Sequence, residues 1–245
     1  MKRATPLVVL RSAIFALVFG VGTLVFTPIA LLTFPLPSMM RNRIIALWAF
    51  SMVFAARFIC GIRWEVRGKR YLPRIPTVIL AKHQSAWETM AFQLLFPAPV
   101  FVVKRSLLLI PFFGWGLAMT SPIAIDREAG RDALKQLVAQ GRNRIRKGFW
   151  VVVFPEGTRM APGERGRYRL GGAQLAVKTA RPVLPVAHNA GELWSRRAFL
   201  KFPGKIIVSI GPLIETTNRS ATEVTREAES WIEAEMARLA LPAET

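Results

Sequence analysis

The charge-free stretch near the N-terminus constrains the fold more than any other feature of the chain. Residues 12–40 contain no charged residue, and Leu, Val, Ile, Phe and Ala dominate the run. A run of this length can cross a bilayer as a helix. A cleaved secretory signal fits less well, because Arg11 interrupts the apolar core and no small-residue cleavage site ends it. We therefore predict an uncleaved membrane-associated helix.

A second apolar segment, residues 44–62, follows the turn sequence PLPSMMRNR, so the two segments predict a helical hairpin. If both helices crossed the membrane, Arg41 and Arg43 would lie on the side opposite Lys2 and Arg3. Positive charge prefers the cytoplasmic side, which disfavours that topology. A hairpin that enters one leaflet keeps all these charges at a single interface. We favour this monotopic arrangement over its rival, one true span with an interfacial helix.

The chain is strongly basic, with a formal net charge of +19, and its first acidic residue is Glu65. Such a charge favours anionic membrane lipid, a phosphorylated substrate or an acidic protein as partner. Nucleic acid is the competing partner, but the sequence contains no recognised nucleic-acid motif, and we expect none to bind. The only cysteine, Cys60, excludes a disulfide within the chain.

Beyond residue 62, short β-rich runs alternate with helical patterns. After a first strand and turn in IRWEVRGKRYLP, the predicted strands are 76–81, 99–104, 121–126, 149–154, 182–187 and 205–211, and the predicted helices 86–95, 131–147 and 172–180. This alternation predicts an α/β fold with a mainly parallel sheet flanked by helices, preceded by the membrane-associated hairpin. Several strands are apolar throughout, as expected for strands covered on both faces. We divide the chain into a two-helix segment, 1–62, and an α/β domain, 63–245.

The C-terminal segment SATEVTREAESWIEAEMARLA predicts a further helix. Ser220 and Glu223 have the spacing of a capping box, which marks a helix start. Apolar residues recur at helical spacing on one face. The acidic residues of this segment occupy the remainder, which we interpret as a solvated face.

The stretch AKHQSAWETMAF, residues 81–92, carries the first candidate site. It directly follows a predicted strand, at the sheet edge where α/β proteins bind ligands. Ser85 and Glu88 fit a capping box, which by itself would explain Glu88. If Ser85 is the N-cap, however, His83 lies outside the helix and can fold back over its first turn. Glu88 would then orient the imidazole so that its other nitrogen accepts a proton.

The stretch FWVVVFPEGTR, residues 149–159, carries the second candidate site. A tight turn would need only its Pro and Gly. Arg159, however, presents a fork suited to phosphate, and the backbone amides near Gly157 are candidate donors to an oxyanion. If the strands before the two stretches are parallel, both loops emerge from the same sheet edge. A proton-accepting His83 would then face an anion-binding Arg159.

Four motifs occur in order along the chain: KHQSAWE, GWGLAMTSPIAIDR, FPEGTR and VLPVAHNAG. Together they resemble the four motifs of the membrane glycerolipid acyltransferases, in particular the bacterial 1-acylglycerol-3-phosphate acyltransferases. The resemblance covers roughly residues 64–215, and FPEGTR is its most specific part. The predicted hairpin is similar to the membrane-binding helix pair of that family.

This resemblance implies a role for each matching position. His83 takes the place of the catalytic base and Glu88 that of its carboxylate partner. The positions implied to bind the acceptor phosphate are Arg127, Glu156, Gly157, Thr158 and Arg159. Pro185 falls in the fourth motif, which is associated with the acyl pocket, and Lys104 and Arg169 are candidates added on charge alone. Two positions depart from the family pattern, since the usual partner is Asp where this chain has Glu88, and Asn commonly precedes the histidine where this chain has Lys82.

The expected activity is transfer of a fatty acyl group from acyl-CoA or acyl carrier protein to the sn-2 hydroxyl of lysophosphatidate, giving phosphatidate, on the cytoplasmic face of a bacterial inner membrane. The alternatives are an acyltransferase for a lyso-ornithine lipid or glycerol-3-phosphate, and a non-catalytic lipid-binding membrane protein. Neither a G-x-S-x-G elbow nor a phosphate-binding P-loop occurs. Two histidines and one distant cysteine predict no metal site, and no cofactor beyond the acyl donor is expected.

Overall fold

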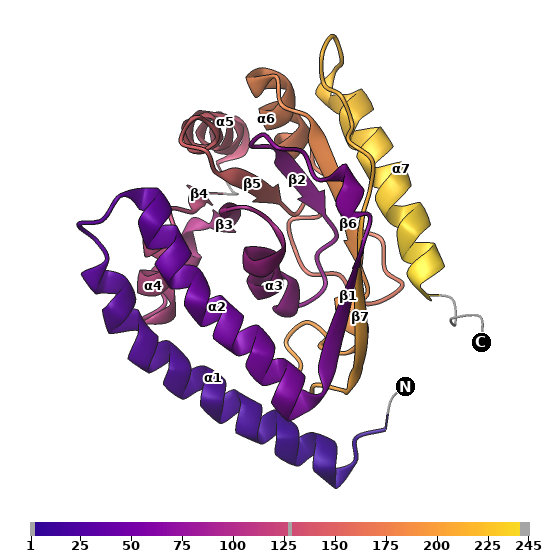
Figure 1. Ribbon diagram of the computed structural model, residues 1–245. Helices are drawn as coiled ribbons and strands as arrows, with labels where there is room; N and C mark the ends of the chain where they lie inside the picture. The colour runs from indigo at the N-terminus through magenta and orange to yellow at the C-terminus, as the bar shows by residue number, and fades with distance from the viewer. Residues whose placement is uncertain (1–2, 127–128, 241–245) are drawn as a thin grey trace.

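A seven-stranded sheet organises residues 3–126 and 129–240, which are those that the computed structural model describes (Figure 1). The strands are β1 (Ile62–Arg67), β2 (Val78–Ala81), β3 (Pro99–Lys104), β4 (Ile123–Ile125), β5 (Trp150–Val153), β6 (Val183–His188) and β7 (Gly204–Ile210). Their spatial order is β1-β7-β6-β2-β5-β3-β4, and every neighbouring pair is parallel except β6 and β7. The predicted mainly parallel sheet is confirmed.

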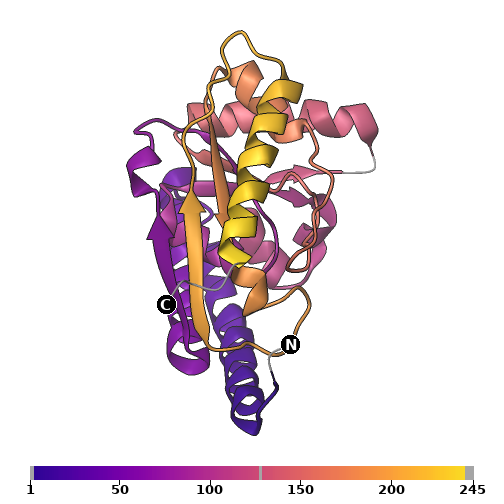
Figure 2. The ribbon, with the colours of Figure 1, turned by 90° about the vertical axis from the view of Figure 1, so that its right-hand side faces the viewer.

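Helices cover both faces of this sheet (Figures 1 and 2). They are α1 (Pro6–Leu32), α2 (Ser38–Cys60), α3 (Trp87–Leu95), α4 (Phe113–Met119), α5 (Gly130–Arg146), α6 (Gly171–Thr179) and α7 (Ala221–Ala240), with short 3₁₀ helices η1 (Lys69–Tyr71), η2 (Arg105–Leu109) and η3 (Ala190–Glu192). Successive residues of a strand point to opposite faces of the sheet and so pack in different cores. In β2, Ile79 packs in the core with α2 and α3, and Leu80 in the core with α5, α6 and α7. Both side chains are buried, which explains why the central strands are apolar throughout.

The predicted hairpin is present as α1 and α2, which pack against each other and are both long and apolar enough to cross a membrane. Gly61 ends α2 with a left-handed φ of 72°, and its N–H donates to Arg57 O. Ile62 then opens β1 opposite Gly204, so the chain passes from hairpin to sheet without a linker. The division into segments 1–62 and 63–245 stays a prediction.

One helix escaped the sequence analysis. Residues 113–119 form α4, which packs between η2 and the two long helices, and the strand predicted for 121–126 shrinks to β4. Gly114 and Gly116 lower the helix propensity of this stretch and hide its pattern. Gly114 is required by packing, because a Cβ there would lie 2.6 Å from Leu107 O.

The predicted C-terminal helix and its capping box are confirmed. The Ser220 N–H donates to Glu223 Oε2 at 2.8 Å, and the Glu223 N–H donates to Ser220 Oγ at 3.2 Å. Figure 2 shows α7 running along the sheet, where it packs on β6. The interpretation of its acidic cluster as a solvated face is wrong for Glu233, whose side chain is only 17% exposed.

Candidate active site

The two candidate loops meet at the carboxyl edge of the sheet, as the sequence predicts for parallel strands. β2 and β5 are parallel neighbours, so the loop after each leaves on the same side. Two backbone contacts join the loops: the Met160 N–H donates to His83 O at 2.8 Å, and the His83 N–H donates to Glu156 Oε2 at 3.1 Å. The position of His83 therefore depends directly on the FPEGTR loop.

His83 and Glu88 form a hydrogen-bonded pair. His83 Nδ1 lies 2.8 Å from Glu88 Oε1, and the same oxygen accepts the N–H groups of Gln84 at 3.0 Å and Ser85 at 2.8 Å. Burial opposes ionisation of the fully buried Glu88, but the nearby imidazoles of His188 and His83 and the Ser85 N–H outweigh it and lower the pKa of Glu88. A carboxylate only accepts hydrogen bonds, so Nδ1 carries the proton. Nε2 of His83 is then left to accept a proton.

The helix behind this pair starts one residue later than predicted. Ala86, not Ser85, is the N-cap of α3. Ser85 Oγ accepts the N–H of Trp87 at 3.1 Å, and only the Glu88 side of the capping box forms. Ala86 already has a φ of −83° and a ψ of −20°, and the Ser85 hydroxyl meets the amide two residues ahead. Glu88 caps the turn and holds His83 with the same oxygen, so the structural and catalytic interpretations are compatible.

Phe154 fixes the plane of the His83 ring. The two rings stack with centroids 3.9 Å apart and an interplanar angle of 12°. Phe154 ends the apolar run before the FPEGTR turn, and the sequence analysis gave it no role. The sequence signal that could have pointed to Phe154 is its position as the first residue of the FPEGTR motif, directly before Pro155. The His83 side chain is 15% exposed.

A buried charge cluster lies behind His83. Lys82 is 1% exposed, and its Nζ lies 2.7 Å from Glu156 Oε1, 2.9 Å from Glu233 Oε1 and 3.0 Å from Glu164 O. The Tyr168 hydroxyl donates to Glu233 Oε1 at 2.9 Å. The family resemblance grouped Glu156 with the phosphate-binding positions. In the structure, its carboxylate instead contacts Lys82 and the His83 N–H.

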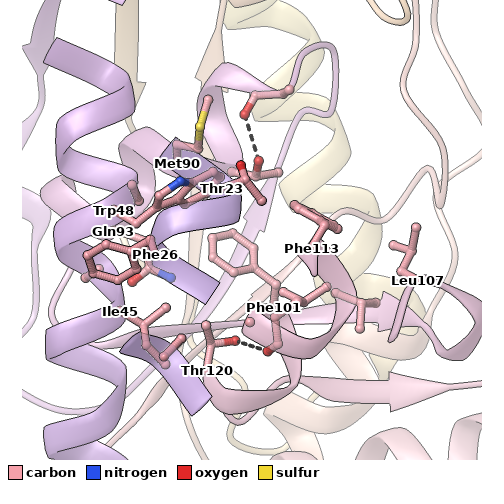
Figure 3. A pocket seen from close by; sticks show the side chains of 18 of the residues that line it. Thr23, Phe26, Ile45, Trp48, Met90, Gln93, Phe101, Leu107, Phe113 and Thr120 are labelled. Atoms are coloured by element: carbon pink, nitrogen blue, oxygen red, sulfur yellow. Dashed lines mark hydrogen bonds between the residues drawn. The ribbon is translucent and has the colours of Figure 1, made fainter. Parts of the chain in front are cut away.

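An apolar cavity of about 250 Å³ opens beside His83. Figure 3 shows side chains that line this cavity. Its walls come from α1, α2, α3, β3 and α4, with Phe26, Ile45, Trp48, Met90, Phe101 and Phe113 among the lining side chains. Two of the predicted site residues, His83 and Arg159, also line it. Nε of Arg159 is buried and has no hydrogen-bond partner among residues 3–126 and 129–240. The cavity therefore joins a proton acceptor and a guanidinium to a long apolar wall.

The other predicted site residues lie around this centre or away from it. Thr158 and Arg169 are exposed on the FPEGTR side, where the Arg169 guanidinium lies over Gly157. Lys104 is exposed at the end of β3. Pro185 is buried within β6 opposite Leu80 and does not line the cavity. Arg127 lies outside the described residues.

The described part of the chain contains no group of three or more His, Cys, Asp or Glu side chains that could hold a metal ion.

Of the backbone amides near Gly157 that the sequence suggests as oxyanion donors, that of Gly157 itself donates to Phe154 O at 3.0 Å within its own turn. This centre can therefore accept a proton at His83 Nε2 and bind an anion at Arg159, next to a site for an apolar chain.

Comparison with known proteins identifies the family of the chain. A family profile described as Acyltransferase matches residues 63–189. A 1-acyl-sn-glycerol-3-phosphate acyltransferase from Pseudomonas aeruginosa is 42% identical over 94% of this chain and 91% of its own length. An enzyme of the same name from Saccharomyces cerevisiae is 29% identical over 76% of this chain and 63% of its own. The chain belongs to the acyltransferase family.

The fold also matches a solved structure, that of the 1-acyl-sn-glycerophosphate acyltransferase from Thermotoga maritima. The TM-score is 0.73 and the sequence identity 21%, over 98% of this chain and 97% of the other. The match includes the N-terminal helices as well as the sheet, because it spans nearly the whole of both chains.

Proposed function

We infer that this chain is a 1-acylglycerol-3-phosphate acyltransferase, which moves a fatty acyl group from a thioester donor to the sn-2 hydroxyl of lysophosphatidate and forms phosphatidate. The observation that carries this inference is the apolar cavity that reaches His83 and Arg159 together. An acyl chain fits its wall, and an acceptor phosphate suits its guanidinium. The similarity to the Pseudomonas enzyme over nearly the whole chain supports the same substrates.

In the reaction that we propose, His83 Nε2 removes the proton from the acceptor hydroxyl, and the oxygen attacks the thioester carbonyl. The tetrahedral intermediate collapses with loss of the thiolate, which takes the proton back from the imidazolium. Glu88 stabilises the imidazolium and keeps Nδ1 as the donor, because it accepts that hydrogen bond from within the protein at 2.8 Å. Phe154 holds the ring in place by stacking. The donor is acyl-CoA or acyl carrier protein.

The extra methylene of Glu88, relative to the Asp of the family pattern, is accommodated by the hydrogen bonds around it. The carboxylate belongs to a residue five positions along the chain, and it reaches Nδ1 while still accepting two backbone N–H groups. Lys82, the other departure, contributes a buried charge where the pattern has a neutral amide. Glu88 and Lys82, the two residues that depart from the family pattern, therefore both have hydrogen-bond or ion-pair partners in this chain.

Arg159→Ala is expected to raise KM for lysophosphatidate roughly ten- to hundredfold, the cost of losing charge-assisted hydrogen bonds to phosphate. The kcat value should change less, because Arg159 does not take part in proton transfer. The measurement is steady-state acyl transfer with lysophosphatidate and with a phosphate-free monoacylglycerol. Arg165→Ala is the matched control, since Arg165 is exposed and pairs with Glu229. An unchanged KM in Arg159→Ala would remove this residue from the phosphate site.

Ala46→Phe is expected to shift the preferred acyl chain to a shorter length, because Ala46 lines the cavity and the added ring occupies part of it. Activity with the longest accepted acyl-CoA should fall about tenfold relative to shorter ones, as for an overfilled core site. A series of acyl-CoA donors measures this. Leu47→Phe is the control, because Leu47 is 54% exposed and does not line the cavity. An unchanged chain-length profile would place the acyl chain elsewhere.

The rival functions have distinct outcomes. A panel of acceptors separates lysophosphatidate from glycerol-3-phosphate and lyso-ornithine lipid, and a non-catalytic lipid-binding protein would transfer acyl groups to none of them. The notion of a simple binding protein explains neither the oriented His83 nor its pairing with Glu88.

The location that we propose is the cytoplasmic face of a bacterial inner membrane, with α1 and α2 in one leaflet. α1 is held to the α/β domain at two points: Ser12 Oγ accepts the Lys201 N–H at 2.9 Å, and Thr27 Oγ1 donates to Phe112 O at 3.1 Å. Fifteen residues of helix place these points about 22 Å apart. A helix standing across the bilayer would pull one of its domain contacts into the hydrocarbon. Labelling of a cysteine at Ser38 from the side opposite the N-terminus would contradict this placement.

A further inference from the structure

A second exposed apolar surface lies outside the helix pair. Within residues 61–126 and 129–240, ten large hydrophobic side chains are exposed, and six of them fall in the segment 107–115, which joins η2 to α4. Leu109 is 78% exposed, Trp115 44% and Phe112 42%. Hydrophobic side chains scattered singly need no explanation, but a cluster of this density marks an interaction site.

This segment adjoins the apolar surface of α1. α4 packs against both α1 and α2 (Figure 1), and the Thr27 hydroxyl of α1 donates to Phe112 O. The outward side of α1 is itself apolar and exposed, for example at Leu17 (67%) and Leu32 (80%). The 107–115 segment therefore extends a surface that is already suited to lipid.

The charges around the segment favour an anionic bilayer as its partner. Arg105 precedes it and is exposed, and the chain contains no acidic residue between Glu88 and Asp126. Basic residues beside an apolar surface bind anionic head groups, and a tryptophan such as Trp115 is typical of the membrane–water interface. An acidic protein would also be attracted by the basic charge, but the continuity with α1 favours lipid.

Backbone geometry indicates that the exposed turn is held in place. Phe112 has a φ of 60° and a ψ of −64°, and the Phe113 N–H donates to Pro111 O at 2.7 Å, which makes a γ-turn. This type of γ-turn is rare and strained, and such strain persists where the surrounding structure enforces it, often at functional sites. Here the γ-turn at Phe112 is held by the hydrogen bond from Thr27 and by the close packing of Gly114 on Leu107 and Leu108.

We propose that the 107–115 segment enters the same leaflet as α1 and forms a second membrane contact, with Arg105 at the anionic head groups. The inner side of this segment lines the cavity through Leu107 and Phe113 (Figure 3). Its insertion places one wall of the cavity in the lipid, so that an acceptor reaches His83 without leaving the membrane. The inference rests on the proposed function for the identity of that acceptor, but the contact itself does not depend on activity.

The test is a polarity-sensitive fluorophore on Leu109→Cys, in full-length protein that carries Cys60→Ala so that only one cysteine reacts. We expect a blue shift and at least a twofold gain in emission on adding vesicles of phosphatidylglycerol and phosphatidylethanolamine. Lipids with a shallow nitroxide should then quench it. Leu134→Cys is the matched control, because Leu134 is 37% exposed and belongs to α5, which packs on the sheet face opposite to α2 (Figure 1). Leu17→Cys reports on α1.

The outcomes separate the inference from the proposed membrane location. If the label at Leu17→Cys enters the bilayer and the one at Leu109→Cys stays in water, the 107–115 segment is not a membrane contact. If both stay in water, the membrane location of the hairpin fails as well. A response of Leu109→Cys to acyl carrier protein, but not to vesicles, would identify a protein-docking surface and overturn the proposal.

Leu109→Asp provides a kinetic test that leaves the cavity intact, because Leu109 does not line it. KM for lysophosphatidate in vesicles should rise about tenfold, as expected for removing one leucine from lipid. KM for a short-chain acceptor in detergent micelles should stay within twofold of the wild type. Equal changes with both acceptors would indicate damage to the active site and contradict the membrane contact.

Discussion

Replacing His83 with alanine is expected to lower kcat by roughly a hundred- to ten-thousandfold, the usual contribution of a positioned general base. His83 lines the cavity while its Nδ1 is held by Glu88 at 2.8 Å, so Nε2 is the imidazole nitrogen left to accept a proton. KM for lysophosphatidate should change little, because the phosphate contacts remain. Transfer of radiolabelled acyl groups by purified protein measures both parameters.

A double-mutant cycle with Glu88→Gln tests whether the two residues act as one unit. Glu88→Gln keeps an oxygen for the Ser85 and Gln84 N–H groups but removes the charge that stabilises the imidazolium, and should lower kcat about a hundredfold. In the His83→Ala background the same change should cost almost nothing, because there is no imidazole left to orient. Additive losses would show that Glu88 acts independently of His83. Full activity of His83→Ala would overturn the mechanism.

Local patterns carried most of what the sequence could predict about the fold. The strands that precede the two candidate loops were recognised because β-branched runs bounded by Pro and Gly are local signals, and the parallel neighbours β2 and β5 then followed from the α/β alternation. The helix α4 was missed because Gly114 and Gly116 lower its helix propensity, and the close packing of Gly114 against η2 appears only in the folded chain.

The same distinction applies to the site. The pairing of His83 with Glu88 spans five residues and could be derived from the helix start, whereas the contact between Lys82 and Glu233 spans 151 residues and has no local signature. From the sequence alone, Glu233 was assigned to a solvated helix face and Lys82 was only a departure from a family pattern. Glu156 was likewise grouped with anion-binding positions, and nothing in the sequence indicated that its carboxylate contacts Lys82 and the His83 N–H.

Lys82→Met should reduce the free energy of unfolding by about 3–5 kcal/mol, because it leaves the carboxylates of Glu156 and Glu233 close together without their shared cation. It should also lower kcat, since Glu156 Oε2 accepts the His83 N–H and will move if its other oxygen loses Lys82. Urea denaturation and acyl-transfer assays measure the two effects. Lys205→Met is the control: its pair with Glu65 is exposed, and its loss should cost about 1 kcal/mol or less.

Neutralising Glu156 and Glu233 in the Lys82→Met background distinguishes an effect on stability from an effect on the position of His83. In the triple variant Lys82→Met, Glu156→Gln, Glu233→Gln no buried charge is left unpaired, so most of the lost stability should return, as replaced buried ion pairs elsewhere have shown. If kcat recovers together with stability, the cluster serves only to hold the fold. If stability returns while kcat stays low, the charges set the position of His83 with the help of Glu233 on α7, 151 residues from Lys82 in the chain. A Lys82→Met protein as stable as the wild type would contradict the buried ion pairs themselves.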